Sequence, residues 1–527
     1  MSVEGRLGRE RRAQERAMSG GTTRRKDPGG NSGLGSFEPH GGDFGFAEAR
    51  HLLWRAGFGG SAAQVALIAG WGLERAVEHL VGYGGVEAGT RPAEVRGDIK
   101  RERTAEERRA ERAARQSRDE ESLARIRLTI QQRERDDRRQ MSQVQRWWLA
   151  RMIETARPLE EKLTLLWHGH FATSYRTIEN SYHMLRQNEM FRSHAAGNFG
   201  QMLFAIIRDP AMLAYLNNNQ SRRDRPNENL ARELMELFSL GVGNYSERDI
   251  KEGARALTGY TFVGNEFAFQ ASNHDPNPKR VLGKAVSDGD DFVKAILAKR
   301  ECAEFVCAKL YRYFVGDYPS GVAQADEAAA GVIKEMSREL LRARYELRPV
   351  LRRLFLSGHF YSARVRGSQI KSPTQLVVGA VRSLNTPARD LDVLSDAMDR
   401  MGQELFYPPS VKGWDGGRSW INTATLYARQ NAMVYLISGK RPVGRDALAD
   451  AEPFRPEELV KAAEALGMSE GDAVAALLMV MIGRADINER GDLEEFARRR
   501  SGGGRVDHAT LVELAMLIAA LPRYQLC

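Results

Sequence analysis

The stretch from Arg225 to Tyr260 reads RPNENLARELMELFSLGVGNYSERDIKEGARALTGY and predicts two helices joined by a glycine corner. One apolar stripe at helical spacing is formed by Leu230, Leu234, Leu237 and Phe238. Asn227 is placed to cap the first helix, and Gly241 can end it because glycine adopts positive φ at little cost. Ser246 and Asp249 form a capping box for the second helix.

Working outward, the helical pattern continues on both sides of this stretch. Thr261 to Gln270 instead carries aromatic and β-branched residues around Gly264-Asn265, a pattern typical of a β-hairpin. After Asp288 helical periodicity returns almost to the C-terminus. We therefore expect a mainly α, multi-helix protein of two lobes with a small β-hairpin insert and a lobe boundary near residues 285–290.

We expect a helical domain over residues 44–527, preceded by a tail and containing a charged helical arm. Residues 1–43 are rich in Arg, Gly and Ser and poor in large apolar side chains, which predicts a disordered basic tail. The segment from about 93 to 145 is mostly charged, with signs that alternate along the chain. It predicts a long exposed helix supported by i,i+4 ion pairs, which could be a hairpin arm or a strut that binds a partner; the alternative is a solvated spacer.

Composition narrows the possible classes of protein. The net charge of +9 resides largely in the tail and the charged segment, so it does not by itself indicate nucleic-acid binding. Three cysteines make no disulfide framework, and no apolar run is long enough to span a membrane. The N-terminal arginines are not followed by an apolar segment, so the sequence as it stands predicts a cytoplasmic protein.

Nine ordered segments together resemble a bacterial family known as domain of unknown function 1800. The resemblance extends from about residue 47 to the C-terminus, and its segments are HLLWRAGFG at His51, KLTLLWHGHFATS at Lys162, DPAMLAYL at Asp209, PNENLARELMELFSLGVGNYSE at Pro226, RALTGYTF at Arg255, HDPNPKRVLG at His274, ELRPVLRRLF at Glu346, KSPTQLVVGAVRSL at Lys371 and PPSVKGWDGGRSWI at Pro408. It implies a helical bacterial protein, often exported, with a sulfatase-like protein as its partner. It implies no particular reaction.

Two histidines form the candidate metal site. His168 and His170 are two residues apart, and on a continuous helix they diverge by roughly 200°. If Gly169 breaks the helix, both rings can turn to one point and hold a divalent transition metal, for which imidazole is a good ligand. The alternative is a pair of core or capping histidines bonded to the main chain.

Three acidic or basic groups are candidates for catalysis. Glu233 borders the apolar stripe, and a partly buried carboxyl group with a raised pKa can act as a general acid or base. His274 and Asp275 lie in a proline-rich loop after the hairpin, where Asp275 could orient His274 as a base. The alternatives are an ion pair for Glu233 and a simple turn at Asp275-Pro276.

Four further residues are candidates for substrate binding. Asn227 is at the N-terminal end of the first helix. Lys279 is in the proline-rich loop, where its amine can bind an anion. Lys412 and Trp414 share a glycine-rich loop, in which the indole either stacks on a sugar ring or packs between the lobes.

Two functions from different classes remain open. The first is a metal-assisted or acid/base hydrolase with His168, His170, Glu233 and His274 at the lobe junction, acting on an envelope polymer such as a polysaccharide. The second is a non-catalytic assembly or export partner that binds another protein through its charged arm. A nucleic-acid binder that uses the basic tail is a third, weaker hypothesis.

Overall fold

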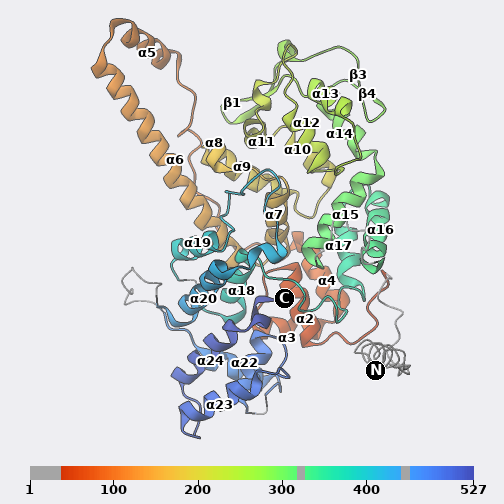
Figure 1. Ribbon diagram of the computed structural model, residues 1–527, viewed down its shortest axis with the longest axis vertical. Helices are drawn as coiled ribbons and strands as arrows, with labels where there is room; N and C mark the ends of the chain where they lie inside the picture. The colour runs from red at the N-terminus through yellow and green to blue at the C-terminus, as the bar shows by residue number, and fades with distance from the viewer. Residues whose placement is uncertain (1–36, 317–326, 388, 441–451, 470) are drawn as a thin grey trace, which may run out of the picture.

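The computed structural model describes residues 37–316, 327–387, 389–440, 452–469 and 471–527. The fold is mainly α, as predicted, with small antiparallel hairpins (Figure 1). Most of the predicted disordered tail lies outside the described residues. Of its last part, Phe37 is buried in the core and Pro39 forms a β-bridge with Ser357.

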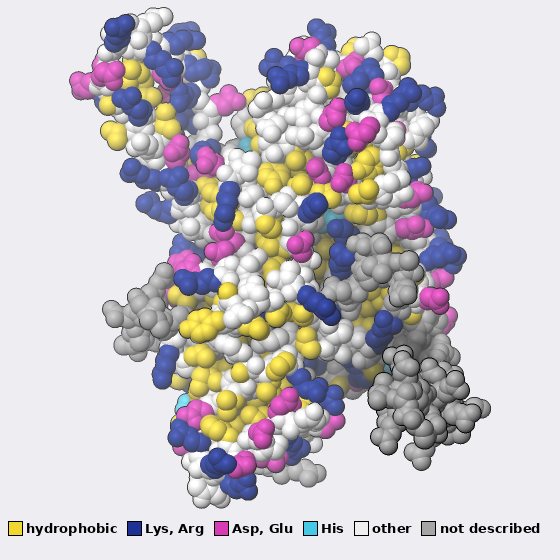
Figure 2. Space-filling model, in the orientation of Figure 1, with side chains coloured by type: hydrophobic (Ala, Val, Ile, Leu, Met, Phe, Trp, Pro, Cys, Tyr) yellow, Lys and Arg dark blue, Asp and Glu magenta, His cyan; other side chains and the backbone are white. Residues whose placement is uncertain are grey.

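The first helices pack together at the N-terminal side of the body and are followed by a projecting arm. Their bounds are α2 Phe46–Ala56, α3 Ala62–Trp71, α4 Leu73–Val81 and the 3-10 turn Tyr83–Gly85. The arm is a helical hairpin of α5, Ala105–Ser117, and α6, Glu120–Glu154. Thr104 and Asp119 cap these two helices, which pack against each other, and Leu123, Ile126 and Ile130 of α6 are half-buried. Figure 2 shows acidic and basic side chains interspersed over the arm.

The middle of the chain contains the opening stretch and both hairpins. Its helices are α7 Pro158–His170, α8 Tyr175–Ile178, α9 Ser181–Ser193, α10 Phe199–Ile206, α11 Pro210–Tyr215, α12 Asn229–Glu236 and α13 Glu247–Ala256, with 3-10 turns at Asn218–Gln220 and Ala271–Asn273. Asn227 Oδ1 accepts a hydrogen bond from the amide of Asn229, and Ser246 and Asp249 form the predicted capping box. The glycine corner also forms, since Gly241 and Gly243 have positive φ.

The hairpin predicted around Gly264-Asn265 is present, and a second one follows it. β1, Tyr260–Val263, pairs with β2, Glu266–Phe269. The segment from His274 to Gly283, predicted as a loop, instead contributes β3, Lys279–Val281, which pairs with β4, Lys284–Val286. A three-residue strand is too short to show an alternating pattern in the sequence, and its edge is covered by α13, so packing rather than periodicity defines it.

The remaining helices complete the body. They are α14 Gly289–Leu297, α15 Arg300–Phe314, α16 Glu327–Arg342, α17 Leu347–Leu356, α18 Pro373–Leu384, α19 Leu391–Arg400, α20 Thr423–Ser438, α21 Pro456–Ala465, α22 Ala473–Met481, α23 Arg490–Ser501 and α24 His508–Ala520, with 3-10 turns at Gly417–Trp420 and Pro522–Gln525. Within the described ranges no helix is long and apolar enough to cross a membrane.

Two hydrophobic clusters form the core. One joins α2 to α4 with the middle of the chain as far as Val365, and the other joins the base of α6 with the chain from Leu376 onward. Core residues on both sides of 285–290 belong to the first cluster, and the second cluster also includes Tyr175 and Met184 from the middle of the chain. The lobe boundary near 285–290 stays a prediction. Helix α7 contributes side chains to both clusters.

Candidate functional site

Helix α7 forms one wall of the candidate site. Pro158 starts it at the first helical position, where the missing N–H is not needed, and nearly every side chain of the helix is buried. Leu163 and Leu166 pack in the first cluster and Leu165 in the second, because the helix is apolar on most of its faces. The helix therefore carries its few polar side chains, Lys162 among them, into the interior between the clusters.

The loop from Phe406 to Trp420 covers the C-terminal end of α7. Gly413 has a φ of 76°, and a Cβ at this position would overlap the carbonyl oxygen of Gly169. A Cβ at Gly169 would itself lie 3.6 Å from the ring of Trp414. That distance is an ordinary van der Waals contact, so Gly413 alone is required for the contact between the main chains of loop and helix, which places Trp414 and Lys412 beside α7.

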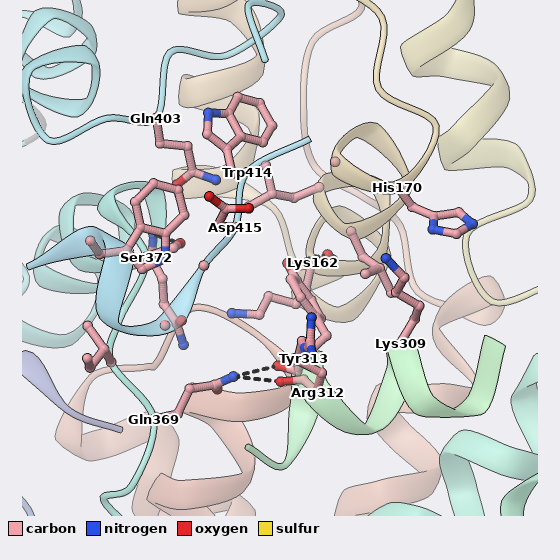
Figure 3. Close-up of a pocket in the computed structure, with 18 of the residues that line it drawn as sticks. Lys162, His170, Lys309, Arg312, Tyr313, Gln369, Ser372, Gln403, Trp414 and Asp415 are labelled. Atoms are coloured by element: carbon pink, nitrogen blue, oxygen red, sulfur yellow. Dashed lines mark hydrogen bonds between the residues drawn. The ribbon is translucent and has the colours of Figure 1, made fainter. Parts of the chain in front are cut away.

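Between α7, α15, the start of α18 and this loop lies a cavity of about 170 Å³ (Figure 3). Its charged lining consists of Lys162, Lys309, Arg312, Lys412 and Asp415. Its aromatic and amide lining consists of Tyr313, Trp414, Trp420, Gln369, Gln375 and Gln403. Four cationic side chains and one carboxylate give the cavity a positive balance, and the rings provide flat apolar surfaces.

Lys162 is unusual among these groups because its amine is buried without a polar partner in the described chain. Its side chain is only 3% exposed and reaches from α7 into the cavity (Figure 3). The amine lies 5.2 Å from the centre of the Phe58 ring and 5.3 Å from that of Tyr313, and among the described residues it has neither a hydrogen-bond acceptor nor a carboxylate partner. Burial lowers the pKa of Lys162 to about 7, so near neutral pH a large fraction of the amine is uncharged.

His170 also lines the cavity, but its ring points into an aromatic cluster. Its Nε2–H donates to the carbonyl of Phe238 at 3.0 Å, while Nδ1 is buried without a hydrogen-bond partner within the described chain. Burial lowers the pKa of His170 to about 3, and the nearby Lys309 ammonium contributes in the same direction. The imidazole is therefore neutral at ordinary pH.

His168 lies on the other side of α7 and is 1% exposed. Its Nε2 accepts a hydrogen bond of 3.0 Å from the amide of Phe406, and its ring packs against Trp148 and Trp414. Burial lowers the pKa of His168 to about 3. His168 therefore holds the start of the loop against α7.

The two histidines do not meet. Helix α7 continues through Gly169 to His170, so the break that would aim both rings at one point does not occur. The described part of the chain contains no group of three or more His, Cys, Asp or Glu side chains arranged to hold a metal ion. The physical reason is that each ring has its own main-chain partner, Phe406 for one and Phe238 for the other.

Glu233 lies near the cavity without lining it. Its Oε2 is buried and has no hydrogen-bond partner within the described chain. Burial, with the Glu236 carboxylate adding to it, raises the pKa of Glu233, and the charges of Arg232 and Lys412 oppose this shift. Glu233 is therefore within electrostatic range of Lys412, which does line the cavity.

The other sequence candidates form a separate structural unit. His274 Nδ1 is 2.8 Å from the carbonyl of Thr258 and its Nε2 is 3.2 Å from that of Ser287. Asp275 accepts hydrogen bonds from Arg255 and from the amide of Asn277; burial opposes its ionisation, but these bonds lower its pKa overall. The Lys279 amine donates to the carbonyls of Asp275 and Asn277.

These contacts show that His274, Asp275 and Lys279 fasten the second hairpin to α13 and the turn after it. Asn227 caps α12 and also donates to the carbonyl of Asn217. None of these four residues lines the cavity. Of the nine candidate residues, the structure brings three to it: His170, Lys412 and Trp414.

The sequence profile of the family described as Protein of unknown function (DUF1800) matches residues 51–526. The chain belongs to this family. No curated protein and no solved structure matched the chain. The matched range extends from within α2 to the final 3-10 turn and so covers nearly the whole described fold. Every residue that lines the cavity lies within this range.

Sequence reasoning missed Lys162 and Lys309. A signal for Lys162 was present: in PLEEKLTLLW a lysine interrupts a helix that is apolar on several faces, so its amine must be buried or must point into a cavity. Lys309 gave no such signal, because α15 carries charges along its exposed face, and only the position of α15 beside α7 brings that lysine to the site.

Proposed function

We propose that this family member binds an acidic sugar, as a unit of an envelope polysaccharide, in the cavity beside α7. The observation that carries the proposal is the convergence of Lys162, Lys309 and Lys412 on one cavity, where none of the three amines has a carboxylate ion-pair partner within the described chain. Like charges in a partly buried site repel one another, and a bound carboxylate would relieve that repulsion.

The aromatic lining supports a ring-containing ligand. Trp414, Trp420 and Tyr313 border the same cavity as the lysines. Flat aromatic faces bury the apolar face of a sugar ring, and the side-chain nitrogen of Gln403, which makes no hydrogen bond within the described chain, offers a donor for its hydroxyls. A small aromatic acid would match the charge equally well but would leave the Gln403 side-chain nitrogen without an acceptor.

The test is a matched pair of ligands that differ in one charged group. Glucuronate and glucose would be titrated calorimetrically into the protein at low and high salt. We expect glucuronate to bind at least about tenfold more tightly than glucose, with the difference shrinking in salt. Equal binding of the two, or no binding of either, would overturn the proposal.

Hydrolysis of the bound polymer is the catalytic form of this proposal. Glu233 supports it, since a carboxyl group with a raised pKa close to Lys412 is suited to act as a general acid. With an acidic polysaccharide as substrate, we expect Glu233→Gln to abolish the release of reducing ends. Glu236→Gln is the matched control, because Glu236 is on the same helix as Glu233 but already accepts a hydrogen bond from the hydroxyl of Tyr245. Full release by Glu233→Gln would remove Glu233 from the mechanism.

A second candidate function is favoured by the arm. The hairpin of α5 and α6 projects from the body (Figure 1), and Leu128 near its middle is 62% exposed. These features support docking of another protein, for which a sulfatase-like protein is the proposed partner. Co-purification of that partner with the intact chain, lost in Leu128→Glu but kept in Leu67→Glu, would support this function. Leu67 is a comparably exposed leucine on α3 of the body.

A further inference from the structure

We infer that the Lys162 amine is a nucleophile that forms an imine with the aldehyde or keto group of an anionic ligand bound in the cavity. The inference rests on the proposed function, which places an acidic ligand there, and adds the ligand's chemical class: an oxo acid, which includes the open-chain form of an acidic sugar. The structural basis is a buried amine, reaching into a cavity, that makes no hydrogen bond to the described chain.

Comparison with the other buried lysines shows how Lys162 differs. The amine of Lys371 donates to the carbonyl of Tyr524 at 2.6 Å, and the amine of Lys279 donates to the carbonyl of Asp275 at 2.6 Å. Both amines serve to hold main chain in place. Lys162 instead lies beside the faces of Phe58 and Tyr313. Within the described chain no acceptor holds its nitrogen, so its lone pair is available once the proton leaves.

Burial and the surrounding charges together set the pKa at which that proton leaves. Burial is the main cause that lowers the pKa of Lys162; Arg55 of α2 lowers it further, and Cys527 opposes the shift. Lys309 and Arg312 of α15 and Lys412 of the loop face the same cavity as cations, while Asp415 faces it as an anion. Among these lining groups the cations outnumber the anion.

The proposed step balances without an oxidant or a reductant. The nitrogen lone pair attacks the carbonyl carbon and forms the C–N bond, while the carbonyl π electrons move to oxygen, which takes up a proton. The resulting carbinolamine loses that oxygen as water, and the nitrogen gives up both of its original hydrogens to yield the imine. Lys309 and Lys412 are placed to hold the ligand's carboxylate during this step.

The first experiment uses glyoxylate, a small anionic aldehyde, with cyanoborohydride at pH 6.5, and maps the reduced adducts by peptide mass spectrometry. It uses the wild-type chain, so no variant has to fold. We expect Lys162 to be modified at least about tenfold faster than the exposed Lys284, because far more of the Lys162 amine is uncharged at this pH. Modification of Lys162 no faster than Lys284 would overturn the inference.

A matched ligand without a carbonyl separates this inference from the proposed function. Glycolate differs from glyoxylate only in carrying a hydroxyl in place of the aldehyde. If glycolate slows the modification of Lys162 but not of Lys284, the imine forms inside an anion-binding cavity, as we infer. If both acids bind by calorimetry but no adduct forms at Lys162, the imine is refuted and the anion site stands. If neither binds and Lys162 is unmodified, both proposals fail.

Discussion

Gly413 and Gly169 lie in direct main-chain contact, so that no side chain fits at position 413 without displacing either the loop or helix α7. The contact joins the loop of Lys412 and Trp414 to the helix of Lys162 and His170. Two segments more than two hundred residues apart in the sequence thereby form opposite walls of one cavity. The geometry of the site therefore depends on residue 413 being a glycine, which has no Cβ.

Gly413→Ala should open this contact. The added Cβ meets the carbonyl of Gly169, and the positive φ is itself unfavourable for alanine, so we expect a loss of about 2–4 kcal/mol in the free energy of unfolding and a loss of glucuronate binding. Denaturant unfolding and calorimetry measure the two effects. Gly416→Ala is the control: its φ is also positive, at 77°, but nothing lies within 4 Å of the added Cβ. Equal effects of the two variants would show that backbone strain alone is responsible.

Glu161, next to Lys162 on α7, should be essential for stability. Its side chain is fully buried and accepts hydrogen bonds from Trp148, Arg151 and Arg192. Glu161→Gln removes the negative charge between two guanidinium groups, so we expect a loss of about 3–5 kcal/mol in the free energy of unfolding. Glu228→Gln, which weakens a half-exposed pair with Arg232, should cost less than about 1 kcal/mol. Unfolding curves of similar midpoint for both variants would contradict this account.

Local signals predicted much of the fold, because they depend on neighbours in the sequence. The caps at Asn227 and Ser246, the corner at Gly241 and the hairpin at Gly264-Asn265 each arise from a few adjacent residues, and each is present in the structure. The second hairpin was missed because its strand β3 exists through contact with α13, which no short window of sequence contains.

The site was predicted less well, for a related reason. A polar residue in a loop has the same appearance in the sequence whether it faces a cavity or holds a turn. His274 and Asp275 hold a turn, since main-chain carbonyls and Arg255 satisfy them. Trp414 faces the cavity because Gly413 brings its loop onto α7. Only the tertiary contact distinguishes the two cases.

The buried histidines should make the protein sensitive to acid. The pKa of His168 is lowered to about 3 in the folded protein but is about 6.5 when the chain unfolds, so the unfolded state binds the extra proton. The contribution of the neutral His168 ring to the free energy of unfolding is therefore fully present above pH 6.5. It is lost as the pH falls toward 3, by up to roughly 4 kcal/mol. His168→Gln keeps an acceptor for the Phe406 amide without a titrating group, so its free energy of unfolding should fall less steeply with acid.

The control for His168 is His508, which is exposed and paired with Glu457. His508→Gln should retain the steep wild-type decline between pH 6.5 and 4. Denaturant unfolding at half-unit steps of pH provides the comparison. A His168→Gln profile parallel to that of the wild type would mean that the ring is already protonated in the folded protein.

Lys162 should give a pH dependence of the same sign, but in a higher pH range. Burial lowers its pKa to about 7 in the folded protein, whereas a lysine in the unfolded chain has a pKa near 10.4, so between these values the unfolded state again holds the extra proton. The free energy of unfolding should therefore rise with pH from about 7 to 10, by up to roughly 1.4 kcal/mol per unit, and the cost of the buried charge is greatest below pH 7.

Lys162→Met removes this charge and should be more stable than the wild type at pH 6.5, with the advantage shrinking toward pH 10. Lys284→Met, at an exposed position on β4, is the control and should show no such trend. If Lys162→Met loses stability at every pH by the same amount, the amine contributes through packing rather than through its charge.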